Sequence, residues 1–326
     1  MSRGGGGRLA LALALVLSTV ALPCSAAALK VGFYKGKCGL VDVESVVASI
    51  VASRFSKDRS VVAALLRLQF HDCFVNGCDA SILLDGSSSE KTAGPNSSVR
   101  GYDLIDRAKA AVEAICPGVV SCADIIVMAT RDAVALAKGG RYDVQTGRLD
   151  GKISLAQNVN LPSPSMTVSQ AASAFARKGL AVADMVVLLG GHTVGIAHCS
   201  LFQDRLYNFD GLGNPDPTMD PKLAAALRAR CPQFATADNT VNLDQNSSSA
   251  LVVDSSFYKQ IVARRGILQI DQELALDRLS KSLVATLANA TDFAARFGRA
   301  MVKLGALQSR LPGEIRSSCR AVNKRS

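Results

Sequence analysis

The sequence of 326 residues contains no tryptophan and only three histidines, His71, His192 and His198. Any site built on histidine therefore has to use these positions. No dense basic run with interleaved aromatic residues occurs, which argues against a nucleic-acid-binding surface. No internal repeat is visible, and beyond the first 28 residues no apolar run resembles a membrane-spanning helix of about 20 residues. These absences favour a globular protein with neither nucleic acid nor membrane as a partner.

The first 28 residues are typical of a secretory signal peptide. Two arginines precede the apolar run Leu9–Leu22, and small residues follow from Ser25 to Ala28. A membrane anchor is the alternative, but the apolar run is short for a span. We predict cleavage near Ala28, which makes residues 1–28 the signal peptide and residues 29–326 a single domain.

The number of cysteines also supports secretion. Of nine cysteines, Cys24 lies in the predicted signal peptide, and the even number that remains argues for four disulfides in an oxidising compartment. The sequence alone does not choose among the many pairings of Cys38, Cys73, Cys78, Cys116, Cys122, Cys199, Cys231 and Cys319. Three asparagines, Asn96, Asn246 and Asn289, each begin an Asn-x-Ser/Thr glycosylation acceptor.

The hydrophobic pattern is mainly helical, with loops rich in Gly, Pro, Asn and Ser between the helices. No long linker divides the chain, so we expect one mainly α-helical domain, with a joint between two helical halves near residues 160–164. Asp42 is the expected N-cap of the first helix. The predicted helices are Val43–Phe55, Val61–Phe74, Tyr102–Ile115, Ser121–Ala137, Ser169–Arg177, Ala183–Leu189, Pro221–Arg230, Ser256–Arg264 and Asp292–Leu304.

The first motif pairs an arginine with a histidine. Arg67 and His71 are four residues apart and therefore share one face of a predicted helix. This pair suits peroxide cleavage, because a neutral imidazole can move a proton between the two oxygens while a guanidinium stabilises the charge that develops. Taken alone, His71 would be an ordinary core or surface histidine. The surrounding string Arg-x-x-Phe-His-Asp-Cys-Phe-Val-x-Gly-Cys-Asp-Ala-Ser is too long to be accidental.

The same string contains hard oxygen ligands. Asp72, Asp79 and Ser81 supply side-chain oxygens, and Val75 and Gly77 could add backbone carbonyls, as hard cations accept. A solvated acidic turn is the plainer interpretation. A zinc site on His71 and the nearby cysteines is disfavoured, because a second ligand pair is missing.

The second motif is Gly-Gly-His-Thr-Val-Gly around His192. Glycines allow a flat ligand to approach the backbone closely, and haem iron commonly takes one firm histidine ligand. A carboxylate should bond to the other ring nitrogen of such a ligand, and Asp271 is the candidate. His198 fits no metal motif, and we expect it to be structural or exposed.

Together these motifs resemble the secreted plant (class III) haem peroxidases, from Phe33 to Asn323. The resemblance implies a single haem-peroxidase domain with one haem b between a distal and a proximal helical half. Hydrogen peroxide would oxidise the haem iron by two electrons, and two molecules of a small phenolic donor would return one electron each.

The resemblance also implies a role for individual residues. On the distal side it matches Arg67, Phe70 and His71, with Asn96 orienting the histidine. On the proximal side it matches His192 and Asp271, and at the edge where phenols dock it matches Pro162. The implied disulfides are Cys38–Cys116, Cys73–Cys78, Cys122–Cys319 and Cys199–Cys231.

Two calcium ions belong to the implied cofactors. The distal ion would be held by Asp72, Val75, Gly77, Asp79 and Ser81, with Glu90 nearby. The proximal ion would be held by Thr193, Asp244, Ser247, Val252 and Asp254, although the loop from Ser247 to Val253 is longer than is usual in the family.

The expected partners are hydrogen peroxide and small phenolic donors, and the expected state is a monomer. The formal net charge of +10 indicates either adhesion to acidic cell-wall polysaccharide or simply a solvated basic surface. The short tail after Cys319 favours the cell wall over the vacuole. Two alternative functions are a secreted haem-binding protein with little turnover and a cofactor-free structural protein of the cell wall.

Overall fold

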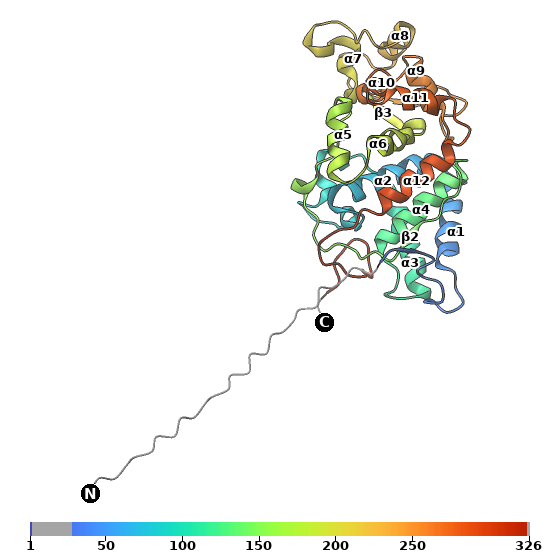
Figure 1. The fold of residues 1–326 in the computed structure, drawn as a ribbon, viewed down its shortest axis with the longest axis vertical. Helices are drawn as coiled ribbons and strands as arrows, with labels where there is room; N and C mark the ends of the chain where they lie inside the picture. Colours follow the sequence, from blue (N-terminus) through green and yellow to red (C-terminus); the bar gives the residue numbers. More distant parts are fainter. Residues whose placement is uncertain (2–27, 325–326) are drawn as a thin grey trace.

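The computed structural model describes residue 1 and residues 28–324, so nearly all of the predicted signal peptide lies outside the described residues. Twelve α-helices, several single 3-10 turns and two small sheets make up this part of the chain, which confirms the mainly α-helical expectation (Figure 1). Within the same residues, no helix combines the length and the apolar character that crossing a membrane requires.

The first half of the chain folds around one buried helix. It comprises α1 (Val43–Phe55), α2 (Val61–Asn76), α3 (Tyr102–Ile115) and α4 (Cys122–Leu136). The side chain of Asp42 accepts a hydrogen bond from the backbone N–H of Glu44 and caps α1 as expected. Because α4 is apolar on almost every face, it lies in the centre and packs against α1, α2 and α3.

The second half contains shorter helices. In chain order these are α5 (Val168–Arg177), α6 (Val182–Leu189), α7 (Gln203–Tyr207), α8 (Pro221–Arg230), α9 (Ser256–Val262), α10 (Gln269–Leu274) and α11 (Lys281–Ala288). The last helix, α12 (Phe293–Gly305), packs against α2 of the first half and α6 of the second. In Figure 1 it lies between the lower group α1, α3 and α4 and the upper group α7 to α11.

Two antiparallel strand pairs tie distant segments together. β1 (Lys30–Val31) pairs with β2 (Gln145–Thr146), and β3 (Ile196–His198) pairs with β4 (Thr240–Asn242). The second pair begins shortly after His192 and returns the chain toward Asp244 and Asp254.

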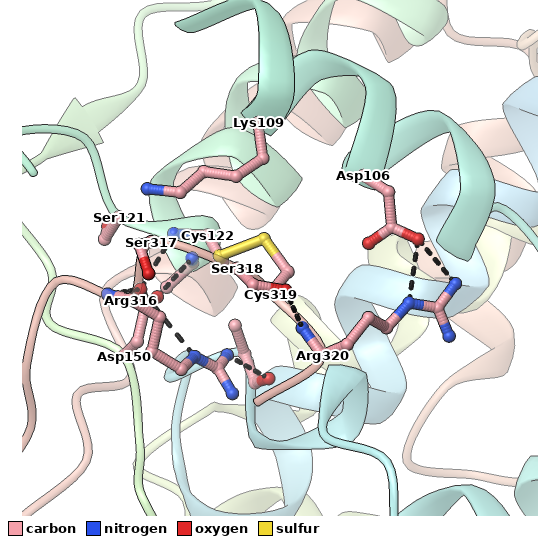
Figure 2. Close-up of a disulfide and its surroundings, with 12 residues drawn as sticks. Asp106, Lys109, Ser121, Cys122, Asp150, Arg316, Ser317, Ser318, Cys319 and Arg320 are labelled. Carbon is pink, nitrogen blue, oxygen red and sulfur yellow. Dashed lines mark hydrogen bonds and ion pairs between the residues drawn. A yellow bond between two sulfur atoms is a disulfide. The ribbon is translucent and has the colours of Figure 1, made fainter. Parts of the chain in front are cut away.

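The structure contains the four disulfides implied by the resemblance. Cys73–Cys78 closes the turn at the end of α2, and Cys199–Cys231 joins the segment after β3 to the end of α8. Cys122–Cys319 connects residues 197 positions apart and fixes the C-terminal segment to the first residue of α4 (Figure 2).

Candidate active site

His71 lies on the inner face of α2, and both of its ring nitrogens have partners. Its Nδ1 is 2.6 Å from Oδ1 of Asn96, and Asn96 in turn donates from Nδ2 to the carbonyl of Glu90 at 2.8 Å. Arg67 donates from Nε to Nε2 of His71 at 3.2 Å. Because Nε2 accepts, the ring proton sits on Nδ1 and is donated to Asn96. The imidazole is therefore neutral, with its lone pair beside the guanidinium.

Electrostatics agree with this protonation state. Burial, followed by the charge of Arg67, lowers the pKa of His71 to about 4, against a smaller opposing effect of the Asn96 hydrogen bond. The guanidinium is itself held in place, because Nη2 donates to the carbonyl of Pro95 at 2.8 Å and Nη1 to Oγ of Ser98 at 3.0 Å.

Phe70 lies beside His71 and is held in place by aromatic packing. Its ring stacks on Phe74 at a centroid distance of 4.8 Å and on Phe175 of α5 at 6.0 Å. The ring is half-buried, so it packs against α5 while leaving part of its surface open beside His71.

His192 occupies the 3-10 turn η5 (Gly190–Thr193) that follows α6. Its Nδ1 lies 2.8 Å from Oδ1 of Asp271, which is buried in α10. The ring remains 31% exposed, so Nε2 is left available for a ligand. Burial lowers the pKa of His192, but the Asp271 carboxylate outweighs this effect and raises the pKa above its ordinary value.

The two histidine pairs lie close enough for one guanidinium to act on both rings. The positive charge of Arg67 opposes protonation of His192, so the guanidinium lies within electrostatic reach of both rings. Each histidine has its Nδ1 bound to a buried oxygen, from Asn96 or Asp271. This donor set fits a planar metal cofactor with a firm ligand on the side of His192 and a proton-transfer pair on the side of His71.

The oxygen ligands expected near the distal histidine are buried together. Asp72 and Asp79 are almost fully buried, and Oδ1 of Asp72 has no hydrogen-bond partner among the described residues. Both carboxylate oxygens of Glu90 and the hydroxyl of Ser81 are buried without a hydrogen-bond partner in the part of the chain that the structure describes. Burial and the charge of Asp79 raise the pKa of Asp72 well above its usual range, and burial raises that of Glu90 to about 7. Such a set favours a bound cation.

The backbone of this loop is also constrained. Gly77 has a φ of +94°, and a Cβ there would lie 2.5 Å from the backbone of Gln308, so no other residue fits. The Val75 carbonyl accepts from Nζ of Lys178 at 2.8 Å. Among residues 28–324, no three His, Cys, Asp or Glu side chains converge as a metal site, so an ion here would depend on carbonyls and Ser81 as well as on carboxylates.

A second oxygen cluster lies beside His192. Oγ1 of Thr193 donates to Oδ1 of Asp254 at 3.1 Å and is 3.5 Å from the carbonyl of Val252. Oγ of Ser256 donates to Asp244 at 3.2 Å, and the backbone N–H of Ser256 donates to Asp254 at 2.8 Å. Burial is the main reason that the pKa of Asp244 is raised.

The structure bonds Ser249, which we did not predict, to Asp244, and no bond between Ser247 and Asp244 is present among the described residues. Ser247 is exposed, whereas Ser249 is buried and donates from Oγ to Asp244 at 2.7 Å. Three consecutive serines, Ser247, Ser248 and Ser249, occupy this loop, so no local pattern distinguishes the one that bonds to Asp244.

Three further residues take distinct positions. Pro162 is half-buried in the irregular segment before α5. His198 is 42% exposed and lies 3.4 Å from Asp238, in agreement with a structural or exposed histidine. Asn96 is buried with both side-chain atoms bonded, so this acceptor is closed to glycosylation in the folded chain, whereas Asn289 is exposed.

A mainly helical domain that sets a histidine–arginine pair opposite a histidine–aspartate pair defines a helical peroxidase. The comparisons with known proteins agree: the family model described as peroxidase matches residues 47–290. The chain belongs to the peroxidase family, among the class III plant peroxidases, and is an oxidoreductase that uses hydrogen peroxide and a reducing substrate. The family implies a haem cofactor.

The relatives are similar over almost their whole length. The chain is 55% identical to Peroxidase 60 of Arabidopsis thaliana over 298 residues, which cover 90% of this chain and 89% of that protein. It is 52% identical to Peroxidase 57 of the same plant, over 92% of this chain and 95% of the relative. Peroxidase 5 of Vitis vinifera is 45% identical, over 91% and 92%. A binding protein with little turnover and a cofactor-free wall protein are therefore not favoured.

Proposed function

We propose that this peroxidase binds one haem b between α2 and η5 and oxidises small phenolic donors. The observation that supports this most is the pair of histidines whose Nδ1 atoms are bonded to Asn96 and Asp271, because this places the ring proton on Nδ1 and leaves Nε2 of each ring unprotonated. When bound, the haem supplies a redox-active iron that exchanges electrons with peroxide and donor.

Each residue around the haem space has a separate task in this proposal. His192 holds the iron through Nε2, and Asp271 keeps the proton on Nδ1 and makes the imidazole a stronger ligand. His71 takes a proton from one peroxide oxygen and returns it to the other, since its Nε2 is unprotonated. Asn96 holds that tautomer, and Arg67 stabilises the negative charge that develops on the departing oxygen. Phe70 packs beside His71 and borders the space for peroxide.

We propose that two calcium ions support these histidines. The distal ion would use Asp72, Asp79 and Ser81 together with the carbonyls of Val75 and Gly77, with Glu90 beside them. The proximal ion would use Thr193, Asp244, Val252 and Asp254, with Ser249 in place of Ser247. The buried oxygens of both sets support this proposal, because uncompensated carboxylates are costly in a protein interior.

The donor and the location belong to the same proposal. Pro162 would border the place where phenols dock. Residues 1–28 would direct the chain to the cell wall, where a monomer with an excess of basic residues could adhere to acidic polysaccharide.

A donor panel tests the proposed activity. The purified holoenzyme should oxidise small phenols with hydrogen peroxide, and His71→Ala should lower the rates for all donors alike, because it slows the step that precedes donor oxidation. If only non-phenolic reductants are oxidised, the proposed donor class is wrong. Haem extraction from the same sample identifies the porphyrin.

A further inference from the structure

The C-terminal segment Glu314–Arg320 is fastened to the start of α4 by several independent bonds. Beside the Cys122–Cys319 disulfide, the buried carboxylate of Asp150 accepts from the backbone N–H groups of Cys122, Ala123 and Arg316 at 3.1, 2.9 and 3.0 Å. The backbones of Asp150 and Glu314 also pair in both directions. Figure 2 shows Arg316 and Asp150 side by side next to the disulfide.

The guanidinium of Arg316 is fully buried in this arrangement. Its Nη2 donates to the carbonyl of Ala80 at 2.7 Å, and its Nε lies 3.8 Å from Oδ2 of Asp150. Within the described chain, Nε and Nη1 make no hydrogen bond. A buried cation with so few hydrogen bonds needs nearby negative charge to offset its loss of hydration.

Ala80 lies at the centre of the proposed distal calcium loop, between Asp79 and Ser81. Its φ is +57°, a left-handed conformation that is unfavourable for a residue with a Cβ. Its N–H donates to Oδ2 of Asp72 at 3.0 Å, and its carbonyl accepts from Arg316. Arg316 therefore holds the turn that keeps the two aspartates of the loop in place.

The charge of Arg316 also acts on these aspartates. Nη2 of Arg316 bonds to the carbonyl of Ala80, which directly follows Asp79 and whose N–H bonds to Asp72, so a single residue separates the guanidinium from both carboxylates. Carboxylates that lie this close repel one another unless a cation compensates them. Calcium would compensate them when bound, and Arg316 is a cation that the chain itself supplies.

We infer that Arg316 is a built-in counter-charge that keeps the Asp72–Ser81 loop assembled when its calcium ion is absent. This inference rests on the proposed distal calcium site. Because calcium and Arg316 would both place positive charge beside Asp72 and Asp79, loss of Arg316 should harm the calcium-free protein more than the calcium-bound one. A purely structural role, through packing or the bond to Ala80, would weaken both forms equally.

The test compares Arg316→Gln, which removes the charge, with Arg316→Lys, which keeps it but loses the planar guanidinium. The thermal midpoint of each holoenzyme is measured in excess calcium and after chelation. We expect the difference between the two conditions to exceed that of the parent by at least about 3 °C in R316Q and to stay near the parental value in R316K. Arg310→Gln is the control, because Arg310 is exposed and makes no ion pair or hydrogen bond within residues 28–324.

The other possible outcomes contradict either the role of Arg316 as a counter-charge or the proposed calcium site. An unchanged difference in R316Q, or an equally widened one in R316K, overturns the counter-charge. Failure to recover R316Q in excess calcium, where R316K is recovered, overturns it as well, because the calcium-bound form should tolerate the loss. A parent that contains no distal calcium, by metal analysis, and shows no difference on chelation contradicts the proposed calcium site instead.

Discussion

At the scale of single residues, the protonation of His71 follows from its neighbours. Arg67 donates to Nε2 and Asn96 accepts from Nδ1, so the ring carries its one proton on Nδ1 and has a lone pair on Nε2. Burial and the adjacent positive charge act in the same direction and lower the pKa of the ring to about 4. A base that stays neutral far below pH 7 can accept a proton from peroxide over a wide pH range.

This predicts the pH dependence of the reaction with peroxide. Since the neutral ring is the active form, the rate should be flat near neutral pH and fall as the pH drops through about 4. Arg67→Leu removes the charge that opposes protonation, so the pKa of His71 should rise and the midpoint of the fall should move upward. Stopped-flow mixing from neutral pH into acidic buffer measures both midpoints. A midpoint in Arg67→Leu equal to or below the parental one would contradict the assignment.

His71→Ala should remove the base without removing the haem. We expect an unchanged Soret band and a reaction with peroxide that is slower by about 10² to 10⁴-fold at pH 7. Arg67→Leu should likewise keep the Soret band. A His71→Ala variant that reacts at the parental rate would show that another group transfers the proton.

At the scale of secondary-structure elements, η5 depends on close packing behind His192. A Cβ at Gly190 would lie 2.3 Å from Oη of Tyr258, whose hydroxyl is fixed by a bond to the Val186 carbonyl at 3.0 Å. A Cβ at Gly191 would meet nothing closer than Phe297 at 3.8 Å, an ordinary contact. Two adjacent glycines thus differ sharply in the space beside them.

Gly190→Ala should therefore destabilise the protein by about 1–3 kcal/mol through overpacking and lower its haem content, because the turn that carries His192 must shift. Gly191→Ala is the matched control and should resemble the parent. Thermal unfolding and the ratio of Soret to protein absorbance measure both effects. Equal behaviour of the two variants would show that η5 adapts freely.

The long helices and two of the short ones, α6 and α9, could be predicted from the sequence, whereas three other short helices could not. The predicted bounds of α1, α3 and α8 agree with the structure, and α2 differs only at its end. The helices α7, α10 and α11 were missed. Each has eight residues or fewer, so its helical period is weak, and helices this short depend on tertiary packing. For that reason Asp271 had to be identified from its motif.

The residues of the site also differ in how well the sequence predicts them. His71, Arg67 and the Asp72–Ser81 ligands lie in one unbroken motif, so their proximity is nearly local. The cluster near Thr193 joins residues about 60 positions apart through a loop of unusual length. There the resemblance implied Ser247, which is exposed, whereas Ser249 is buried and bonds to Asp244. Contacts such as Arg316 to Ala80, 236 positions apart, leave no local signal.

At the scale of the whole molecule, each oxygen cluster adjoins one histidine of the proposed haem site. Asp72 follows His71 and Thr193 follows His192 directly, so an ion at either cluster would fix the backbone beside a haem-facing ring. The helix α12 packs against both α2 and α6, so it contacts both halves of the molecule.

Prolonged chelation should therefore lower both the activity and the thermal midpoint, with partial recovery when calcium is added back. Loss of the ions leaves buried carboxylates that repel one another, which should displace the elements carrying the histidines. Metal analysis of the pure protein separates the cases: about two calcium ions per haem support both sites, one supports only one of them, and none contradicts the proposal.

The central claim is that His192 binds the haem iron while His71 faces it from the other side. The most direct measurement is the visible spectrum of purified parent, His192→Ala and His198→Ala proteins, all expressed with haem supplied. The parent and His198→Ala should show a Soret band with about one haem per chain, and His192→Ala should lose it. Normal haem content in His192→Ala, or a parent without a Soret band, would contradict the account.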